Sequence, residues 1–280
     1  MPAQVEACTP SAVIDRVSLV LDAFDGPGRL SLAQVVRRTG LPRSSAHRLL
    51  ERLVHLRWLR RQGRDYELGM RLVELGSLAV HQDRLHRAAQ PFLHELHRAT
   101  GLVVHLAVLD GVDVVYLEKI AGAFGAAVPS RVGGRQPAHC TAVGKALLAF
   151  SEPSRLDDFD VDLLTRKTKY SVSTRRQLAD ELKAIRARGV AYERGESVTG
   201  FGCVAAPIGD VGQGAEPIAA VSLCGPLDRM AFDHRLAGPV RTTALGIWRN
   251  FDDGGGVRVQ PILQQPRGLH PTPVRTLQYA

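Results

Sequence analysis

The N-terminal part of the sequence encodes two short helices joined by a tight turn, and this pattern constrains the fold more than any other feature. Ser31 and Gln34 have the spacing of a capping box, in which each side chain satisfies a free N–H group at the start of a helix. Gly40 ends that helix, because glycine readily adopts the left-handed conformation that follows a last turn. A second helix starts near Pro42 and runs to about Leu56, with an apolar face made of Ala46, Leu49, Leu50, Leu53 and Val54.

Flanking segments extend this pair of helices into a small module. A helix is expected from Ser11 to Phe24, with Ser11 as its cap, and Gly26-Pro27-Gly28 breaks the chain after it. After the second helix of the pair, residues 58–61 and 66–68 have the composition of strands on either side of a turn. The segment therefore predicts a helix-turn-helix followed by a two-stranded wing.

Positive charge is concentrated in this module. Between Arg37 and Arg64 there are nine arginines and one carboxylate, Glu51, a balance of +8 that equals the formal net charge of the whole chain. A helix-turn-helix lays its second helix in a major groove, and guanidinium groups attract the phosphate backbone. A solvated basic face is the plainer interpretation, but charge, capping and apolar pattern coincide here. We predict an interface with double-stranded DNA formed by Arg43, Ser44, Ser45, His47, Arg48, Arg52, Arg60, Arg61 and Arg64.

The rest of the sequence predicts a larger domain and gives the chain an α+β fold class. Asp110-Gly111 is a hairpin signal between two apolar strands, and Thr174 with Gln177 forms a second capping box. Helices are expected at 70–81, 85–100, 141–150, 175–188 and 233–251, and strands at 102–109, 112–120, 190–192, 201–208 and 217–224. The predicted organisation is a flexible N-terminus (1–10), a DNA-binding domain (11–69), a linker helix (70–84), a second domain (85–251) and a disordered tail (252–280).

Composition excludes several classes of protein. The four cysteines are widely spaced without a C-x-x-C pair, which argues against a disulfide framework and suits a reducing compartment. The first ten residues lack the pattern of a signal peptide, and the longest apolar run, Ala146–Phe150, is too short to span a bilayer. We therefore expect a cytoplasmic protein without membrane association, and we expect no metal, no cofactor and no catalytic residues.

Residues 13–76, with TGLPRSSAHRLLERL at their centre, resemble the winged helix-turn-helix of IclR-type bacterial transcription regulators. The resemblance covers about residues 11–250, because further family motifs follow in the expected order: RVGGRQPAHCTAVGKALLAF, LADELKAIRARGVAYERGES, CVAAPIGD and AAVSLCGP. It implies a GAF-like antiparallel sheet flanked by helices, with a cavity for a small effector. It also implies a homodimer or homotetramer whose effector alters how the DNA-binding helices are presented to a partly palindromic operator.

The same resemblance implies which residues line the cavity. The backbone amides of Ala142 and Val143 would hold an effector carboxylate, which agrees with the affinity of helix N-termini for anions. Glu193 stands where the family often has Asp, and Cys224 stands where it often has Ser. Cys203 and Ser222 complete the predicted set of effector-binding residues. The longer acid and the weakly hydrogen-bonding thiol favour an effector larger or less polar than a short oxoacid, such as an aromatic acid.

Two alternatives come from other classes of protein. Cys140, Cys203 and Cys224 around one cavity would make a redox-responsive or metal-responsive regulator, although the sequence has no ligand spacing; a buried cysteine is also ordinary apolar filler. His139 beside Cys140 would suggest an enzyme, but a nucleophile and its base must meet in space with a third group. The motifs G-x-S-x-G and H-E-x-x-H are absent from the sequence, so we do not expect an enzyme.

Overall fold

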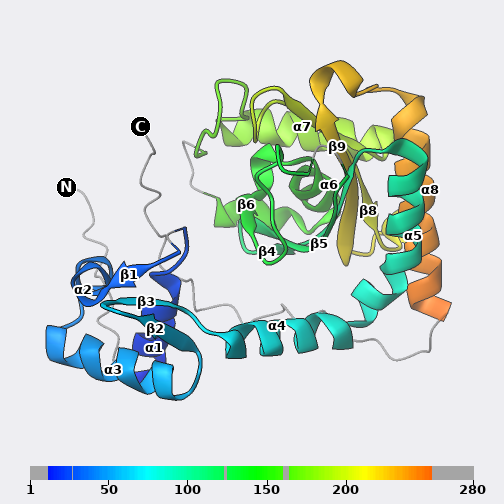
Figure 1. Cartoon of the computed structure of the whole chain (residues 1–280). Helices are drawn as coiled ribbons and strands as arrows, with labels where there is room; N and C mark the ends of the chain where they lie inside the picture. The colour runs from blue at the N-terminus through cyan, green and yellow to red at the C-terminus, as the bar shows by residue number, and fades with distance from the viewer. Residues whose placement is uncertain (1–11, 27, 123–124, 160–163, 254–280) are drawn as a thin grey trace, which may run out of the picture. The chain divides into compact units, whose positions relative to one another are not determined.

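The computed structural model describes residues 12–26, 28–122, 125–159 and 164–253 of the 280-residue chain. The chain divides into two compact units, Met1–Gln82 and Asp83–Ala280 (Figure 1). The predicted flexible N-terminus and nearly all of the predicted tail lie outside the described residues. Asp252 and Asp253 are the exception, since they belong to the last helix and not to a disordered segment.

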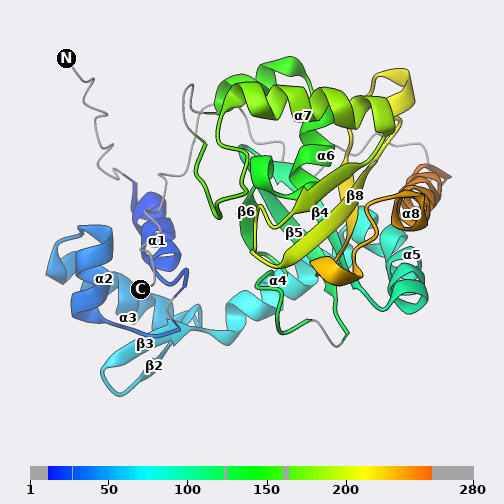
Figure 2. The ribbon, with the colours of Figure 1, turned by 90° about the horizontal axis from the view of Figure 1, so that it is seen from above.

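Three helices and a small antiparallel sheet form the first unit. The helices are α1 (Val13–Asp22), α2 (Leu32–Thr39) and α3 (Arg43–His55). The strands β1 (Leu30–Ser31), β2 (Leu59–Gln62) and β3 (Asp65–Leu68) are ordered β1-β3-β2. A further helix, α4 (Met70–Gln82), follows the wing strands β2 and β3. The predicted helix-turn-helix and wing are thus present (Figures 1 and 2).

The predicted capping signals act as expected around α2. The Ser31 N–H group donates to Gln34 Oε1 at 2.7 Å, and the Gln34 N–H group donates to Ser31 Oγ at 3.4 Å. Gly40 closes the helix at a φ of +69°. Apolar side chains on the inner faces then bury one another, with Val20, Val35 and Leu50 at the centre of the unit. The predicted cap Ser11 lies outside the described residues, and Ala12 precedes the first turn of α1.

The second unit is built on a six-stranded antiparallel sheet in the order β6-β5-β4-β9-β8-β7. Its strands are β4 (Val103–Asp110), β5 (Asp113–Ile120), β6 (Arg135–Pro137), β7 (Ala191–Arg194), β8 (Phe201–Ile208) and β9 (Ala219–Pro226). The Asp110-Gly111 signal makes the predicted hairpin, with Gly111 at a φ of +61°. The antiparallel sheet and the α+β class predicted for the chain are confirmed.

Helices cover both faces of this sheet (Figure 2). One face packs against α5 (Arg84–Thr100) and α8 (His234–Asp253), and the other against α6 (Ala142–Phe150) and α7 (Arg175–Arg188). Side chains alternate between the faces along each strand, so that on β4 Val104 and Leu106 join the first core and Ala107 joins the second. His105, which lies between Val104 and Leu106, therefore points to the same face as Ala107, toward α6.

One capping prediction in this unit is only half right. Thr174 Oγ1 accepts the Gln177 N–H group at 3.2 Å, as a cap of α7 should. The Gln177 side chain, however, accepts from the Ser173 N–H group at 3.1 Å and not from Thr174. The side chain reaches one residue further back, so the reciprocal bond of a capping box is missing.

Candidate functional site

The outer surface of α3 carries the residues that the sequence assigned to a DNA interface. Arg43, Ser44, His47, Arg48 and Arg52 are exposed, and Ser45 is half-buried. Pro42 precedes the first turn and gives it no side-chain cap, so the first N–H groups of this helix are available to an anion. This end of α3 can therefore meet both base edges and a phosphate.

The wing places its arginines differently from the sequence-based expectation. Arg60 forms an ion pair with Glu67, a buried carboxylate that also pairs with Arg29. Arg61 Nη1 lies 3.2 Å from Glu51 Oε1, and its Nε donates to the Gly63 carbonyl at 3.0 Å. Two of the three predicted wing arginines are thus held by partners within the unit, and Arg29 was not identified from the sequence.

The only carboxylate in the arginine-rich segment has a structural partner in the wing. Glu51 on α3 accepts a hydrogen bond of 2.9 Å from the Tyr66 hydroxyl on β3, in addition to its ion pair with Arg61. Burial and the neighbouring carboxylate both raise the pKa of Tyr66, so the phenol stays protonated and keeps donating. Glu51 therefore fixes α3 against the wing.

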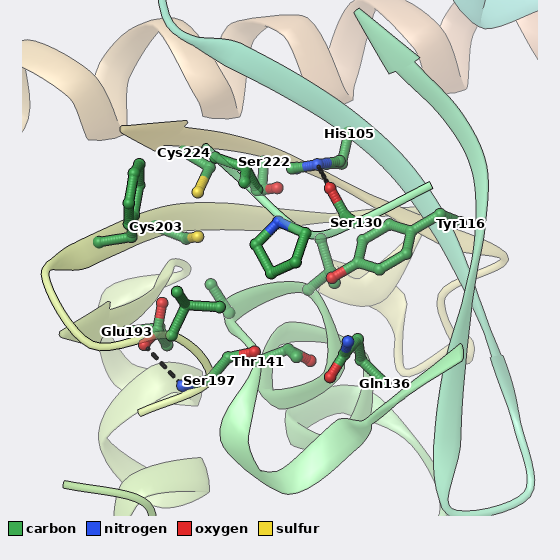
Figure 3. Close-up of a pocket in the computed structure, with 16 residues that line it drawn as sticks. His105, Tyr116, Ser130, Gln136, Thr141, Glu193, Ser197, Cys203, Ser222 and Cys224 are labelled. Carbon is green, nitrogen blue, oxygen red and sulfur yellow. Dashed lines mark hydrogen bonds between the residues drawn. The ribbon is translucent and has the colours of Figure 1, made fainter. Parts of the chain in front are cut away.

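A cavity in the second unit brings the six predicted effector residues together (Figure 3). It lies between the sheet and the start of α6, and its volume is about 30 Å³. That volume admits water but is far below the several hundred Å³ of a typical ligand pocket. The predicted residues that line it are Ala142, Val143, Glu193, Cys203, Ser222 and Cys224.

Ten further lining residues were not identified from the sequence. They are His105, Tyr116, Val128, Pro129, Ser130, Gln136, Thr141, Ser197, Val198 and Phe201. His105 offered a usable signal, since it is a polar residue inside the otherwise apolar run of β4. The segments 128–130 and 197–198 carried no recognisable sequence signal, because they form irregular walls of the cavity without periodicity.

The start of α6 gives one end of the cavity its donors. Thr141 Oγ1 accepts the Gly144 N–H group at 3.2 Å and so caps the helix. In the part of the chain that the structure describes, no acceptor takes the N–H groups of Ala142 and Val143. Free amides at a helix N-terminus are suited to a carboxylate or another small anion.

Glu193 lines the same cavity as these amides and is 2% exposed. Its Oε1 accepts the Ser197 N–H group at 3.1 Å and also the N–H group of Glu196 (Figure 3). Burial raises the pKa of Glu193 to about 7, while the bonds from the two amides partly oppose that rise. The cavity thus contains a carboxyl group that changes its charge near neutral pH.

The opposite end of the cavity is built by neutral groups and an anchored wall. His105 Nε2 lies 2.7 Å from Ser130 Oγ, and burial with the nearby Lys119 lowers the pKa of His105 to about 3. Lys119 Nζ donates to three carbonyls of this wall, those of Gly125 at 3.0 Å, Val128 at 2.7 Å and Ser130 at 2.7 Å. One ammonium group therefore uses all of its donors to hold the wall in place.

The cysteines do not form the reactive cluster that the alternative interpretation requires. Cys203 and Cys224 are cross-strand partners in the cavity, whereas the buried Cys140 is not among the lining residues. A hydrogen bond with Cys224 and burial raise the pKa of Cys203, and burial raises the pKa of Cys140 to about 12. Thiols in this state lack the thiolate that oxidants and soft metals require.

The described residues contain neither a metal-ligand cluster nor a membrane-spanning helix. Among residues 12–26, 28–122, 125–159 and 164–253, no three His, Cys, Asp or Glu side chains are grouped as metal ligands would be. The helices within those ranges include none that is long and apolar enough to cross a membrane. His139, considered above as a base, instead lies 2.9 Å from the Thr165 carbonyl and does not line the cavity.

Comparisons with known proteins match both units. Residues 13–63 fit the family model of the IclR helix-turn-helix domain, and residues 77–249 fit that of the bacterial transcriptional regulator IclR C-terminal domain. The regulator XynR of Escherichia coli is 34% identical over 214 residues, which cover 75% of this chain and 84% of XynR.

Solved structures give the same result. An IclR homologue from Microbacterium hydrocarbonoxydans, in complex with 4-hydroxybenzoate, is 28% identical with a TM-score of 0.75, over 86% of this chain and 99% of that one. The IclR protein of Thermotoga maritima is 27% identical with a TM-score of 0.67, over 85% of this chain and 98% of that one.

Proposed function

The chain belongs to the IclR family of bacterial transcriptional regulators, and from that premise we propose that a small acidic metabolite in the cavity controls operator binding by α3. DNA binding and transcriptional regulation are the activities of this family, and its members are regulators and not enzymes. The proposal concerns the residues that perform each task, the class of effector and the assembly of the protein.

We assign operator contact to the exposed face of α3 and to the wing. The N-terminal residues of a recognition helix meet base edges, and Arg48 has the two-pronged head that suits guanine O6 and N7. Arg64 at the wing turn is exposed, which supports its assignment to a contact with a phosphate or a minor groove. Arg60 and Arg61 can still reach phosphates, because a guanidinium group has five N–H donors and each ion pair uses only some of them.

One observation supports the effector site most strongly. Two free amides at the start of α6 belong to a small cavity whose remaining walls are mostly apolar or neutral. This combination favours a carboxylate on a compact apolar body, such as an aromatic acid. The 4-hydroxybenzoate bound by the Microbacterium hydrocarbonoxydans homologue has this chemistry.

A cavity of about 30 Å³ must enlarge to admit such a ligand. The ligand therefore binds an opened state better than the closed one, and differential affinity of this kind is what shifts a regulator between conformations. We propose that the open and closed states of the second unit correspond to different DNA-binding arrangements.

We further propose a homodimer or homotetramer acting in the cytoplasm on a partly palindromic operator. Exposed apolar side chains support association of copies through the first unit, since Val13 and Ile14 on α1 are 66% and 80% exposed and Val73 on α4 is 63% exposed. Two-fold assembly would place half-sites about one helical turn apart, or a multiple of that distance.

The test measures operator binding and effector binding together. Purified protein is titrated against its own upstream region and against random duplex at near-physiological salt, with and without a panel of aromatic and short-chain carboxylic acids. We expect preference for the upstream region and a change in affinity with at least one aromatic acid. Equal binding to both DNAs under all conditions would refute the proposal, and stabilisation by two- or three-carbon oxoacids alone would refute the effector class.

A further inference from the structure

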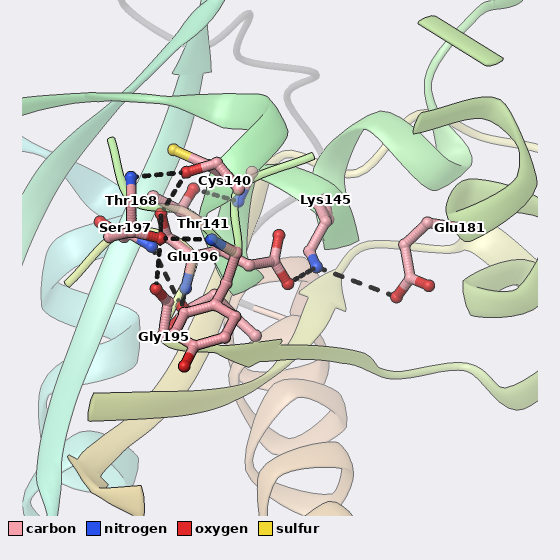
Figure 4. Close-up of polar contacts among 12 residues, drawn as sticks. Cys140, Thr141, Lys145, Thr168, Glu181, Gly195, Glu196 and Ser197 are labelled. Carbon is pink, nitrogen blue, oxygen red and sulfur yellow. Dashed lines mark hydrogen bonds and ion pairs between the residues drawn. The ribbon is translucent and has the colours of Figure 1, made fainter. Parts of the chain in front are cut away.

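Two carboxylates, the buried Glu193 in the lining of the proposed effector site and the partly buried Glu196, lie close together in the sequence. Glu193 is the last but one residue of β7, which ends at Arg194, and Glu196 follows after Gly195. The Glu196 N–H group donates to the carboxylate of Glu193, so the position of one residue fixes the other. Glu196 itself points away from the cavity toward α6 (Figure 4).

Glu196 meets a buried lysine. Its Oε1 lies 2.7 Å from Lys145 Nζ, and the Lys145 side chain is only 1% exposed. Its Oε2 is buried and has no hydrogen-bond partner among the residues that the structure describes. A second carboxylate, Glu181 on α7, lies 3.9 Å from the same ammonium group and is itself paired with Arg188 at 2.6 Å. The Lys145 ammonium group thus forms ion pairs with two carboxylates, Glu196 and Glu181.

The segment that carries Glu196 is held from outside as well. Thr168 Oγ1 donates to the Gly195 carbonyl at 2.6 Å, and Ser171 Oγ donates to the Glu196 carbonyl at 2.6 Å (Figure 4). Ser197, the next residue, lines the cavity and donates to Glu193. The two carboxylates therefore cannot separate without moving a wall of the effector site.

The balance of charge around this pair is negative. Glu193, Glu196 and Glu181 face two cations, Lys145 from α6 and Arg188 from the end of α7. The other titratable groups around Glu193 are the thiols of Cys203 on β8, Cys224 on β9 and Cys140, together with the Tyr116 phenol on β5. Burial raises the pKa of Cys203, Cys140 and Tyr116, so these three groups stay protonated. Lys167 acts at longer range on Cys140. A ligand carboxylate on the α6 amides would add a further negative charge to a site sheltered from water.

We infer that Glu193 and Glu196 act as one proton-accepting unit that determines the charge preference of the effector site, so that an acid enters together with a proton. This inference rests on the proposed function and specifies how that site is regulated. Two ionised carboxylates and a ligand anion repel one another strongly where water is excluded, and protonation of the pair removes that repulsion. Burial raises the pKa of Glu193 to about 7 and also raises the pKa of Glu196. Protonation is therefore accessible near neutral pH.

The direction of the effect follows from these charges. Below pH 7 the pair already carries the proton, and an acid binds without further cost. Above pH 7 the proton must be taken from solution, so affinity for the acid falls by up to about tenfold for each pH unit. An uncharged ligand of the same shape adds no charge to the site, and its affinity should hardly change over this range.

The test uses the full chain, with 4-hydroxybenzoate as the acid and 4-hydroxybenzamide as its uncharged counterpart. Calorimetric titrations between pH 6 and pH 8.5 are run in pairs of buffers that differ in ionisation enthalpy, which gives the number of protons taken up. We expect close to one proton per acid bound at pH 8, a loss of affinity for the acid with rising pH, and neither effect with the amide.

Variants identify the responsible groups. Glu193→Gln and Glu196→Gln should each flatten the pH dependence and tighten acid binding at pH 8, a gain that general damage to the fold would not produce. Glu216→Gln is the matched control, since Glu216 is a partly exposed carboxylate of the same unit that pairs with Arg155 away from the cavity. It should behave as the unsubstituted protein does.

The outcomes separate this inference from the proposed function. Acid binding without proton uptake and with constant affinity across the pH range would overturn the inference and leave the effector site standing. Because this measurement uses the unsubstituted chain, it tests the inference even if a variant fails to fold. Absence of binding at pH 6, where the pair is protonated, by 4-hydroxybenzoate and by every other acid of the panel would overturn both.

Discussion

The Tyr66 hydroxyl on β3 lies 2.9 Å from the Glu51 carboxylate on α3, and this hydrogen bond joins the wing to the helix to which we assign operator contact. Arg61 approaches the same carboxylate at 3.2 Å. A negative charge on a DNA-facing helix would repel phosphates. Here the Glu51 carboxylate is bound by the Arg61 guanidinium group and by the Tyr66 hydroxyl. The orientation of the wing and the charge of the interface therefore depend on one side chain.

Replacement of Glu51 by glutamine should change the salt dependence of DNA binding. The change removes a negative charge and releases Arg61, so affinity for random duplex should rise and the slope of log affinity against log salt should steepen by about one. Fluorescence anisotropy over a salt series measures both. Glu74→Gln is the control, because Glu74 pairs with Arg57 and Arg71 outside the predicted interface; an equal change of slope in that variant would contradict a special role for Glu51.

Replacement of Arg48 by alanine should affect sequence preference more than general affinity. If the guanidinium group grips a guanine edge, its loss costs about 1–3 kcal/mol on the operator and little on random DNA. Binding to operators with single base changes measures the loss of discrimination. Uniform weakening on every duplex would instead identify Arg48 as a phosphate contact.

The stability of the second unit should depend on pH through Glu193. Its pKa is about 7 in the folded chain and near the ordinary value of 4.5 in the unfolded chain. The folded state therefore binds more protons between these values, and the free energy of unfolding falls as the pH rises through this window, by about 3 kcal/mol in total. Denaturant titrations at pH 5 and pH 8 should show this loss, and Glu193→Gln should largely remove it. An unchanged difference in the variant would assign the pH dependence to other groups.

Replacement of Lys119 by methionine should loosen the wall that covers the cavity. The ammonium group holds the carbonyls of Gly125, Val128 and Ser130, and each hydrogen bond from a charged donor contributes about 1.5–3 kcal/mol. Loss of even one of these bonds should speed effector release by about tenfold, which stopped-flow measurements can follow. Lys119→Arg retains the charge and several donors, so it should recover most of the slow release. Equal release rates in all three proteins would show that the wall does not limit exchange.

Local sequence signals predicted the elements of the fold well, because those signals act between near neighbours. The bounds of α2 are set by local interactions of Ser31, Gln34 and Gly40, and the turn at Gly111 is set within its own hairpin. The strand β6 was missed, since three residues between Gly133-Gly134 and a short 3-10 helix (Ala138–Cys140) carry no period. The two-residue spacing of Ser222 and Cys224 correctly placed both side chains in one cavity.

The parts of the site that the sequence did not reveal depend on tertiary contacts. The ion pairs of Arg60 with Glu67 and of Arg61 with Glu51 join different elements, and a count of charges along the chain cannot show them. The same holds for Lys119, whose partners lie six to eleven residues away in an irregular segment. Lys145 and Glu196 are 51 positions apart, and only the packing of α6 against the end of β7 brings them together.

The small volume of the cavity has a consequence for timing. If the cavity must enlarge to admit a metabolite, as proposed, and the wall of Val128, Pro129 and Ser130 moves to allow this, escape of the metabolite is as slow as that movement. Transcription under such a regulator would outlast the metabolite that triggered it. Brief pulses of nutrient would then be answered by a sustained and smoothed response, with a decay time fixed by one lysine and three carbonyl groups.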